Sequence, residues 1–147
     1  MKMKDQKAGL FMMGTALAAL LVLSIHVFSH DESIPKEILT KKNPVESSDT
    51  VLSAAKGNYE ENCLQCHGES GKGDGPMAGM LEKKPAILTD TEGMSEQTDG
   101  EIYWVITKGR KPMPAFEAKL TEEQRWGLVN LMRSISKTKP NTTARQH

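Results

Sequence analysis

The sequence has no excess of positive charge, because its 147 residues include 19 Lys and Arg against 19 Asp and Glu. Without residues 1–28, which hold several of the lysines, the balance turns slightly acidic. A nucleic-acid-binding domain shows a clear positive excess, so we expect no nucleic-acid partner. The sequence also lacks the alternation of apolar and polar residues that is typical of β-strands. It therefore predicts an all-α fold.

Cysteine is nearly absent, since both thiols of the chain lie in the stretch CLQCH, at Cys63 and Cys66, directly before His67. A structural zinc site needs four ligands, and these three residues would leave it one short. Thiol–disulfide exchange usually places its first cysteine at a helix start after a strand. Here the pair follows a predicted helix, and no sheet is expected. Zinc binding and thiol exchange are therefore the less favoured interpretations.

Charge is also absent from Ala8 to Phe28, a run long enough for a helix of about 31 Å, the thickness of a bilayer's hydrocarbon core. Three lysines precede the run and acidic residues follow it. This bias places the amino terminus in the cytoplasm and the rest of the chain on the periplasmic side. We expect a single-pass anchor in the cytoplasmic membrane. A cleaved signal peptide, cut near Ala16-Leu17-Ala18, is the alternative.

The remaining chain divides by composition. Residues 29–48 are rich in charge and contain two prolines, which predicts a linker. Residues 49–136 carry the helical patterns and form the predicted domain, and residues 137–147 form a flexible tail. A domain of under 90 residues buries a modest core, so we expect it to depend on a cofactor.

Helical patterns can be placed at three longer stretches and one short one. The two carboxyl-terminal stretches each begin with a capping box, in which a threonine precedes a Glu or Gln by three residues. Between Gly68 and Gly79 the sequence is too rich in glycine to hold a helix. The predicted helices are Asp49 to Cys63, Met77 to Glu82, Thr98 to Thr107 and Thr121 to Ser136.

Cys-x-x-Cys-His is the attachment signature of c-type haem, so Cys63 and Cys66 are predicted to bind haem covalently and His67 to ligate its iron. For the opposite face, Met113 is the best candidate, because Pro112 and Pro114 hold its loop extended and leave the thioether little entropy to lose. Met77 and Met80 follow His67 too closely to reach around a porphyrin. Met132 lies on a core stripe, and Met94 stays a weaker candidate.

Over residues 49–136 the chain resembles the class I mono-haem c-type cytochromes of bacteria. The resemblance rests on CLQCHG, GKGDGP, KPMPAF and LTEEQRWGLVNLMRSI. It implies one haem c with His67 and Met113 as axial ligands. It also implies that the carbonyl of Pro76 accepts a hydrogen bond from His67 Nδ1, which would orient the imidazole.

The family's first and last helices cross closely, with a small residue on the first near an aromatic on the last. Ala55 fits the first helix, and Trp126 is the candidate aromatic, because Leu131 stands where one is usual. Tyr103 and Trp104 are expected beside the porphyrin or as ordinary core aromatics.

Protein ligands on both faces of the iron would leave no open position for a substrate. We therefore expect no enzymatic activity but one-electron transfer by a membrane-tethered carrier between respiratory components. Its expected partners are membrane respiratory complexes or periplasmic reductases. Two alternatives stay open: a haem subunit of a larger oxidoreductase, and a gas-binding or peroxidatic haem protein if Met113 leaves the iron readily.

Overall fold

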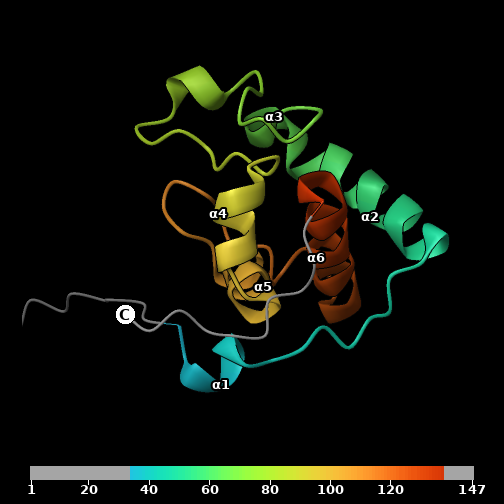
Figure 1. Cartoon of the computed structure of the whole chain (residues 1–147). Coiled ribbons are helices and arrows are strands. Elements are labelled where there is room, and N and C mark those ends of the chain that lie inside the picture. The colour runs from blue at the N-terminus through green and yellow to red at the C-terminus, as the bar shows by residue number, and fades with distance from the viewer. Residues whose placement is uncertain (1–33, 138–147) are drawn as a thin grey trace, which may run out of the picture. The chain divides into compact units, whose positions relative to one another are not determined.

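The structure, a computed structural model, describes residues 34–137. Helices dominate this part of the chain, and the strand-like pairing within it is an isolated bridge between Arg110 and Met113 (Figure 1). The predicted helical class is therefore confirmed there. The predicted anchor, Ala8 to Phe28, and the predicted tail beyond Lys137 lie outside the described residues. No helix within residues 34–137 is long and apolar enough to cross a membrane.

The three longest helices match the predicted ones to within one residue at each end. The predicted short helix at Met77 to Glu82 is only a 3-10 turn, η1. Three further helices of four to six residues were not predicted, because so short a segment shows too little of the 3.6-residue period. The elements are α1 (Lys36–Leu39), α2 (Asp49–Asn62), α3 (Leu64–His67), η1 (Ala78–Met80), α4 (Thr91–Glu96), α5 (Asp99–Lys108) and α6 (Glu122–Ser136).

Both predicted capping boxes are present and fix the starts of α5 and α6. The Thr98 hydroxyl accepts from the amide of Glu101, whose carboxylate accepts from the amide of Thr98. Thr121 and Gln124 make the same reciprocal pair, at 2.8 and 3.2 Å. Each box satisfies amides that have no partner inside the helix.

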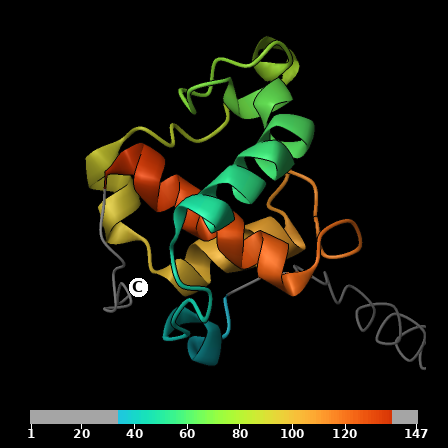
Figure 2. The ribbon, with the colours of Figure 1, turned by 90° about the vertical axis from the view of Figure 1, so that its right-hand side faces the viewer.

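α2 and α6 cross where both carry small residues (Figure 2). A Cβ atom added to Gly127 of α6 would lie 3.7 Å from the side chains of Ala55 and Val51 of α2. The predicted crossing is confirmed, but the assignment of Trp126 to it is wrong. Trp126 instead stacks on Tyr103 of α5, with ring centroids 4.0 Å apart and an interplanar angle of 11°. Its indole fills the interface between α5 and α6.

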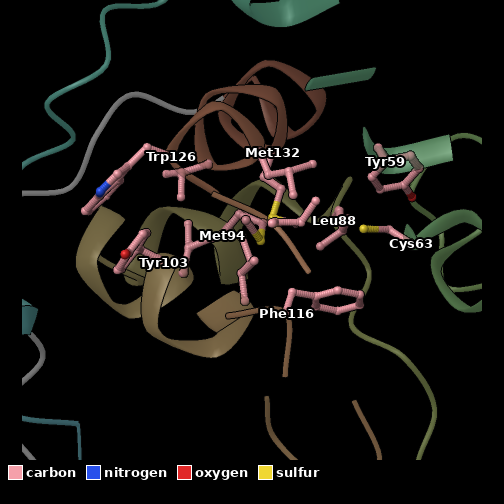
Figure 3. Close-up of a cluster of buried hydrophobic side chains, with 13 residues drawn as sticks. Tyr59, Cys63, Leu88, Met94, Tyr103, Phe116, Trp126 and Met132 are labelled. Atoms are coloured by element: carbon pink, nitrogen blue, oxygen red, sulfur yellow. The ribbon is translucent and has the colours of Figure 1, made fainter. Parts of the chain in front are cut away.

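One cluster of buried side chains forms the core of the described unit (Figure 3). Tyr103 and Trp126 lie at one end of the cluster, and Tyr59 and Cys63 lie at the other. Tyr103 is therefore a core aromatic remote from the CLQCH stretch. Trp104 is half-buried, with the Lys108 ammonium 5.8 Å from its ring centroid. The cluster consists of Tyr59, Cys63, Leu88, Met94, Ile102, Tyr103, Ile106, Phe116, Leu120, Trp126, Leu128, Val129 and Met132.

Residues 34–48 pack against the helical unit, which corrects the predicted linker at residues 29–48 over this part. The side-chain amide of Asn43 donates to the carbonyl of Trp126 at 3.1 Å and to the side-chain oxygen of Asn130 at 2.9 Å. The charge and proline content of this stretch predicted a flexible linker. Composition cannot show that one side chain, the amide of Asn43, will find buried hydrogen-bond partners. The stretch is a strap across α6.

Lys41 makes a second contact between this strap and the helices. Its ammonium lies 3.1 Å from the carboxylate of Glu122 and over both rings of the stacked aromatic pair, 5.4 and 5.5 Å from their centroids. The hydrogen bond from Lys41 lowers the pKa of Glu122, so this carboxylate stays ionised to lower pH than usual. Both groups are exposed, so the pair adds little to stability compared with Asn43.

We expect Asn43→Ala to lower the free energy of unfolding by about 1–3 kcal/mol, because it leaves partly buried acceptors without their donor. Urea unfolding of the full-length protein, followed by helical circular dichroism, measures the change. Lys42→Ala is the matched control: it alters the exposed neighbouring residue and should change stability by less than about 0.5 kcal/mol. Equal stabilities of the two variants would show that the strap is not fixed by Asn43.

Candidate haem site

Cys63, Cys66 and His67 of the CLQCH motif lie on one helical turn. Cys63 ends α2 and opens α3, and its carbonyl accepts from the amides of Cys66 and His67 at 3.1 and 2.9 Å. The two cysteines are not bonded to each other. Cys63 is buried and its sulfur points into the core cluster, toward Leu88 (Figure 3), while Cys66 is half-buried. Both thiols are thus free to form thioether bonds.

Cys63 is poorly suited to thiol exchange. Burial raises its pKa to about 11, and the nearby Cys66 adds to the shift. A reactive exchange cysteine needs the opposite, a depressed pKa in an electropositive, accessible position. For the zinc interpretation, no group of three or more His, Cys, Asp and Glu side chains within residues 34–137 is arranged to hold a metal ion.

His67 is buried, and its Nδ1 lies 3.1 Å from the carbonyl oxygen of Ala86. A carbonyl only accepts, so Nδ1 carries the proton and Nε2 keeps its lone pair. Burial lowers the pKa of His67, and the bond to Ala86 opposes this shift. The ring is therefore neutral near pH 7, which is the form that binds a metal.

The acceptor predicted for His67 was the carbonyl of Pro76, and this assignment is wrong. Pro76 is exposed, because the loop around it is held against the backbone of α3: the amides of Gly73 and Gly75 donate to the carbonyls of His67 and Cys66 at 2.8 and 3.2 Å. The first carbonyl after this loop that lies within hydrogen-bond distance of His67 Nδ1 is that of Ala86. A backbone carbonyl has no sequence signature, so nothing in the sequence marked Ala86.

Tyr59 ties this loop to α2. Its hydroxyl donates to the carbonyl of Gly68 at 2.7 Å, directly after the motif. Burial raises the pKa of Tyr59 to about 12, with smaller contributions from the charges of Cys63 and Asp74, so the hydroxyl remains a donor at any physiological pH. α2 therefore fixes the exit of the motif as well as its entry.

Met113 lies in a tight turn, where an extended loop was predicted. Its amide donates to the carbonyl of Arg110 at 2.8 Å, and its carbonyl accepts from the amide of Arg110 at 3.1 Å. Gly109 opens the turn with φ +77, and a Cβ there would meet the carbonyl oxygen of Met113 at 2.7 Å. The turn is closed by backbone pairing between Arg110 and Met113 in addition to its two prolines. Met113 packs against the core cluster that contains Cys63.

The other methionines of the domain lie in places that suit them less for ligation. Met94 and Met132 are core side chains, 3% and 4% exposed. Met77 and Met80 lie on the surface, at 42% and 73% exposure. Met113 alone among these five is half-buried at the core margin and mounted on a closed turn.

The residues fit a covalently bound haem. Two unbonded thiols and a neutral, oriented imidazole share one turn, and a constrained thioether borders the same apolar cluster. Leu88 and Phe116 lie near Cys63 in this cluster and would supply apolar walls (Figure 3). Nitrogen and thioether ligands in apolar surroundings are the donor set of c-type haem.

Comparison with known proteins agrees with a c-type haem protein. The family described as cytochrome C oxidase, cbb3-type, subunit III matches residues 51–132, more than half of the chain. The chain belongs to this family. It is thus a c-type cytochrome with a small, mostly helical domain, and membership implies covalent haem c and electron transfer.

Two solved structures resemble this cytochrome. One is a chain of the reducing HAO-like protein complex Kustc0457/Kustc0458 of Kuenenia stuttgartiensis, with 30% identity and a TM-score of 0.55, over 63% of this chain and 46% of that one. The cytochrome thus spans about half the length of that relative. The other is the KustC0563 c-type cytochrome, with 27% identity and a TM-score of 0.50, over 58% of this chain and 98% of that one. No curated protein matches the sequence significantly.

We expect the haem of this cytochrome to remain attached during denaturing electrophoresis, where peroxidase staining should reveal it. The Cys63→Ala/Cys66→Ala double variant should show no stained band, because these are the only thiols in the chain. Most of it should also fail to fold, since a domain this small relies on its cofactor. A double variant with full helical content and wild-type stability would contradict the assignment.

Proposed function

We propose that this protein carries single electrons through one haem c, bound by Cys63 and Cys66 and ligated by His67 and Met113. The observation that carries the proposal is the buried His67 ring, whose Nδ1–H is engaged by a carbonyl and whose Nε2 is left to bind iron. The constrained thioether beside the same core supports Met113 as the opposite ligand. Two protein ligands would exclude oxygen, peroxide and other substrates from the iron.

When bound, the haem supplies the Fe(III)/Fe(II) couple. The bond from His67 to Ala86 raises the basicity of the imidazole and prevents its rotation. The apolar cluster around Cys63 excludes water, and a low dielectric disfavours the additional charge of oxidised iron. The neutral thioether of Met113 favours the reduced state relative to a second imidazole. The apolar cluster and the Met113 thioether thus raise the potential, while the fixed orientation of the His67 ring keeps reorganisation between the two oxidation states small.

Met113→Ala should abolish the weak far-red charge-transfer band that reports thioether ligation of Fe(III), and it should open reduced iron to carbon monoxide. Met113→His should keep six ligands and lower the midpoint potential, because imidazole favours Fe(III) more than thioether does. Optical spectra and potentiometric titration of the purified protein measure both effects.

Two methionine variants serve as controls for this test. Met94→Ala removes a core side chain and should cost about 2–5 kcal/mol of stability while it leaves the far-red band in place. Met80→Ala removes an exposed side chain and should change neither. Loss of the band in Met94→Ala, with the band intact in Met113→Ala, would transfer the ligand role to Met94. Ready carbon monoxide binding by the wild-type protein would instead favour the gas-binding alternative.

A second candidate function is that of a haem subunit in a larger oxidoreductase. It is favoured by the family description, which names an oxidase subunit, and by the similarity to a chain of a multi-protein complex. Affinity purification from mildly solubilised membranes distinguishes the two functions. A catalytic protein in constant ratio to the haem would support the subunit, and a free haem protein would support the carrier.

The proposal also includes a tether to the cytoplasmic membrane through residues 8–28, with the haem domain on the periplasmic side. Because the strap at residues 34–48 belongs to the folded unit, only residues 29–33 separate it from the predicted anchor. Five residues span at most about 18 Å, so the haem domain would stay close to the membrane and to integral redox partners.

The protein should therefore remain in the membrane fraction through high-salt and carbonate washes, because the apolar run is held by burial rather than by surface charge. Mass spectrometry of the mature protein should recover the peptide from Ala8 to Phe28 intact. A mature amino terminus that begins after Ala18 would identify this segment as a cleaved signal peptide.

A further inference from the structure

Arg125, near the start of α6, is a buried arginine that makes its hydrogen bonds to backbone and phenol. Arg125 is only 7% exposed. One terminal nitrogen donates to the carbonyls of Glu117 and Leu120, at 3.2 and 2.5 Å, and the other donates to the hydroxyl of Tyr103 at 3.1 Å. Burying a charge costs free energy unless the charge is hydrogen-bonded, and these three bonds provide that compensation. The position of the Glu117 and Leu120 carbonyls in the chain indicates what these hydrogen bonds do.

Both carbonyls lie at the end of the loop that carries Met113, which joins α5 to α6. The amide of Leu120 donates to the carbonyl of Phe116 at 2.9 Å, which closes this end of the loop as a turn. The amides of Phe116 and Glu117 donate to the carbonyls of Ile106 and Thr107, at 3.1 and 3.2 Å, which attaches the loop to α5. Arg125 supplies the corresponding attachment to α6.

We infer that Arg125 is a positioning residue that holds the Met113 loop closed and so keeps the thioether on the iron. The inference rests on the proposed role of Met113 as axial ligand. A guanidinium reaches two carbonyls and a hydroxyl at once through a rigid planar fork, whereas an ammonium on a flexible stem does not. The attachment therefore depends on arginine itself and not on positive charge alone.

Arg133 of α6 provides a matched control, because it is equally buried but serves another part of the chain. It is 6% exposed, forms an ion pair with Asp99 at 2.8 Å, and donates to the carbonyls of Met94 and Gln97. Met94 lies in α4, Gln97 directly follows α4 and Asp99 opens α5, so none of these partners belongs to the Met113 loop. Arg125→Lys and Arg133→Lys should both lower stability, but only Arg125→Lys should loosen the loop.

The experiment measures imidazole binding to the oxidised full-length haem protein, together with the far-red band. Arg125→Lys should bind imidazole on the order of tenfold more tightly than wild type and show a weaker band, the effect of one lost charge-assisted hydrogen bond. Tyr103→Phe, which removes one acceptor of the guanidinium, should give a smaller shift in the same direction. Arg133→Lys should leave imidazole affinity within about twofold of wild type, whatever its loss of stability.

A double variant shows whether Arg125 acts through Met113. In Met113→Ala the iron is already open, so adding Arg125→Lys should change imidazole affinity no further. Equal imidazole affinities for Arg125→Lys and Arg133→Lys, with a normal far-red band in wild type, would overturn the role of Arg125 and leave the proposed function intact. A wild-type protein without the band would overturn both. Tyr103→Phe keeps the test valid if Arg125→Lys does not fold.

Discussion

The hydrogen bond from His67 Nδ1 to the carbonyl of Ala86 determines which ring nitrogen is left for a metal, and the rest of the site follows from it. The bond fixes the tautomer and the plane of the ring, so Nε2 has one direction in which to bind iron. It also joins two segments that are 19 residues apart. The loop between them must therefore fold back on α3, and its amides do so by capping the carbonyls of Cys66 and His67.

The CLQCH turn and the Met113 loop are each attached to one of two long helices that cross, so the geometry of the candidate site depends on this helical frame. α2 leads directly into the CLQCH turn and holds its exit through Tyr59, while α6 reaches the opposite loop through Arg125. These helices cross at Gly127, so their backbones approach closely and small shifts between them are opposed by packing. A redox centre benefits from such a frame, because ligands that move little between oxidation states keep reorganisation small.

The sequence predicted those features that depend on short local patterns of side chains. The capping threonines marked the starts of α5 and α6, CLQCH marked the candidate site of cofactor attachment, and two prolines drew attention to Met113. The sequence did not predict that Ala86 accepts the hydrogen bond from His67, because the acceptor is a backbone carbonyl. It also did not predict that residues 34–48 pack against the helices, because this packing depends on the hydrogen bonds of a single residue, Asn43. Arg125 was missed because an arginine that follows Glu122, Glu123 and Gln124 at the start of an amphipathic helix has the pattern of a solvated residue, and only the fold shows that it is buried.

The central claim is that the iron of this c-type cytochrome is held between the His67 imidazole and the Met113 thioether. X-ray absorption at the iron edge of the purified, oxidised protein tests it directly, because sulfur and nitrogen neighbours scatter differently. The account predicts one sulfur and five nitrogen atoms bonded to iron in wild type, and no bonded sulfur in Met113→Ala. A wild-type spectrum without bonded sulfur, or a sulfur retained in Met113→Ala, would contradict it.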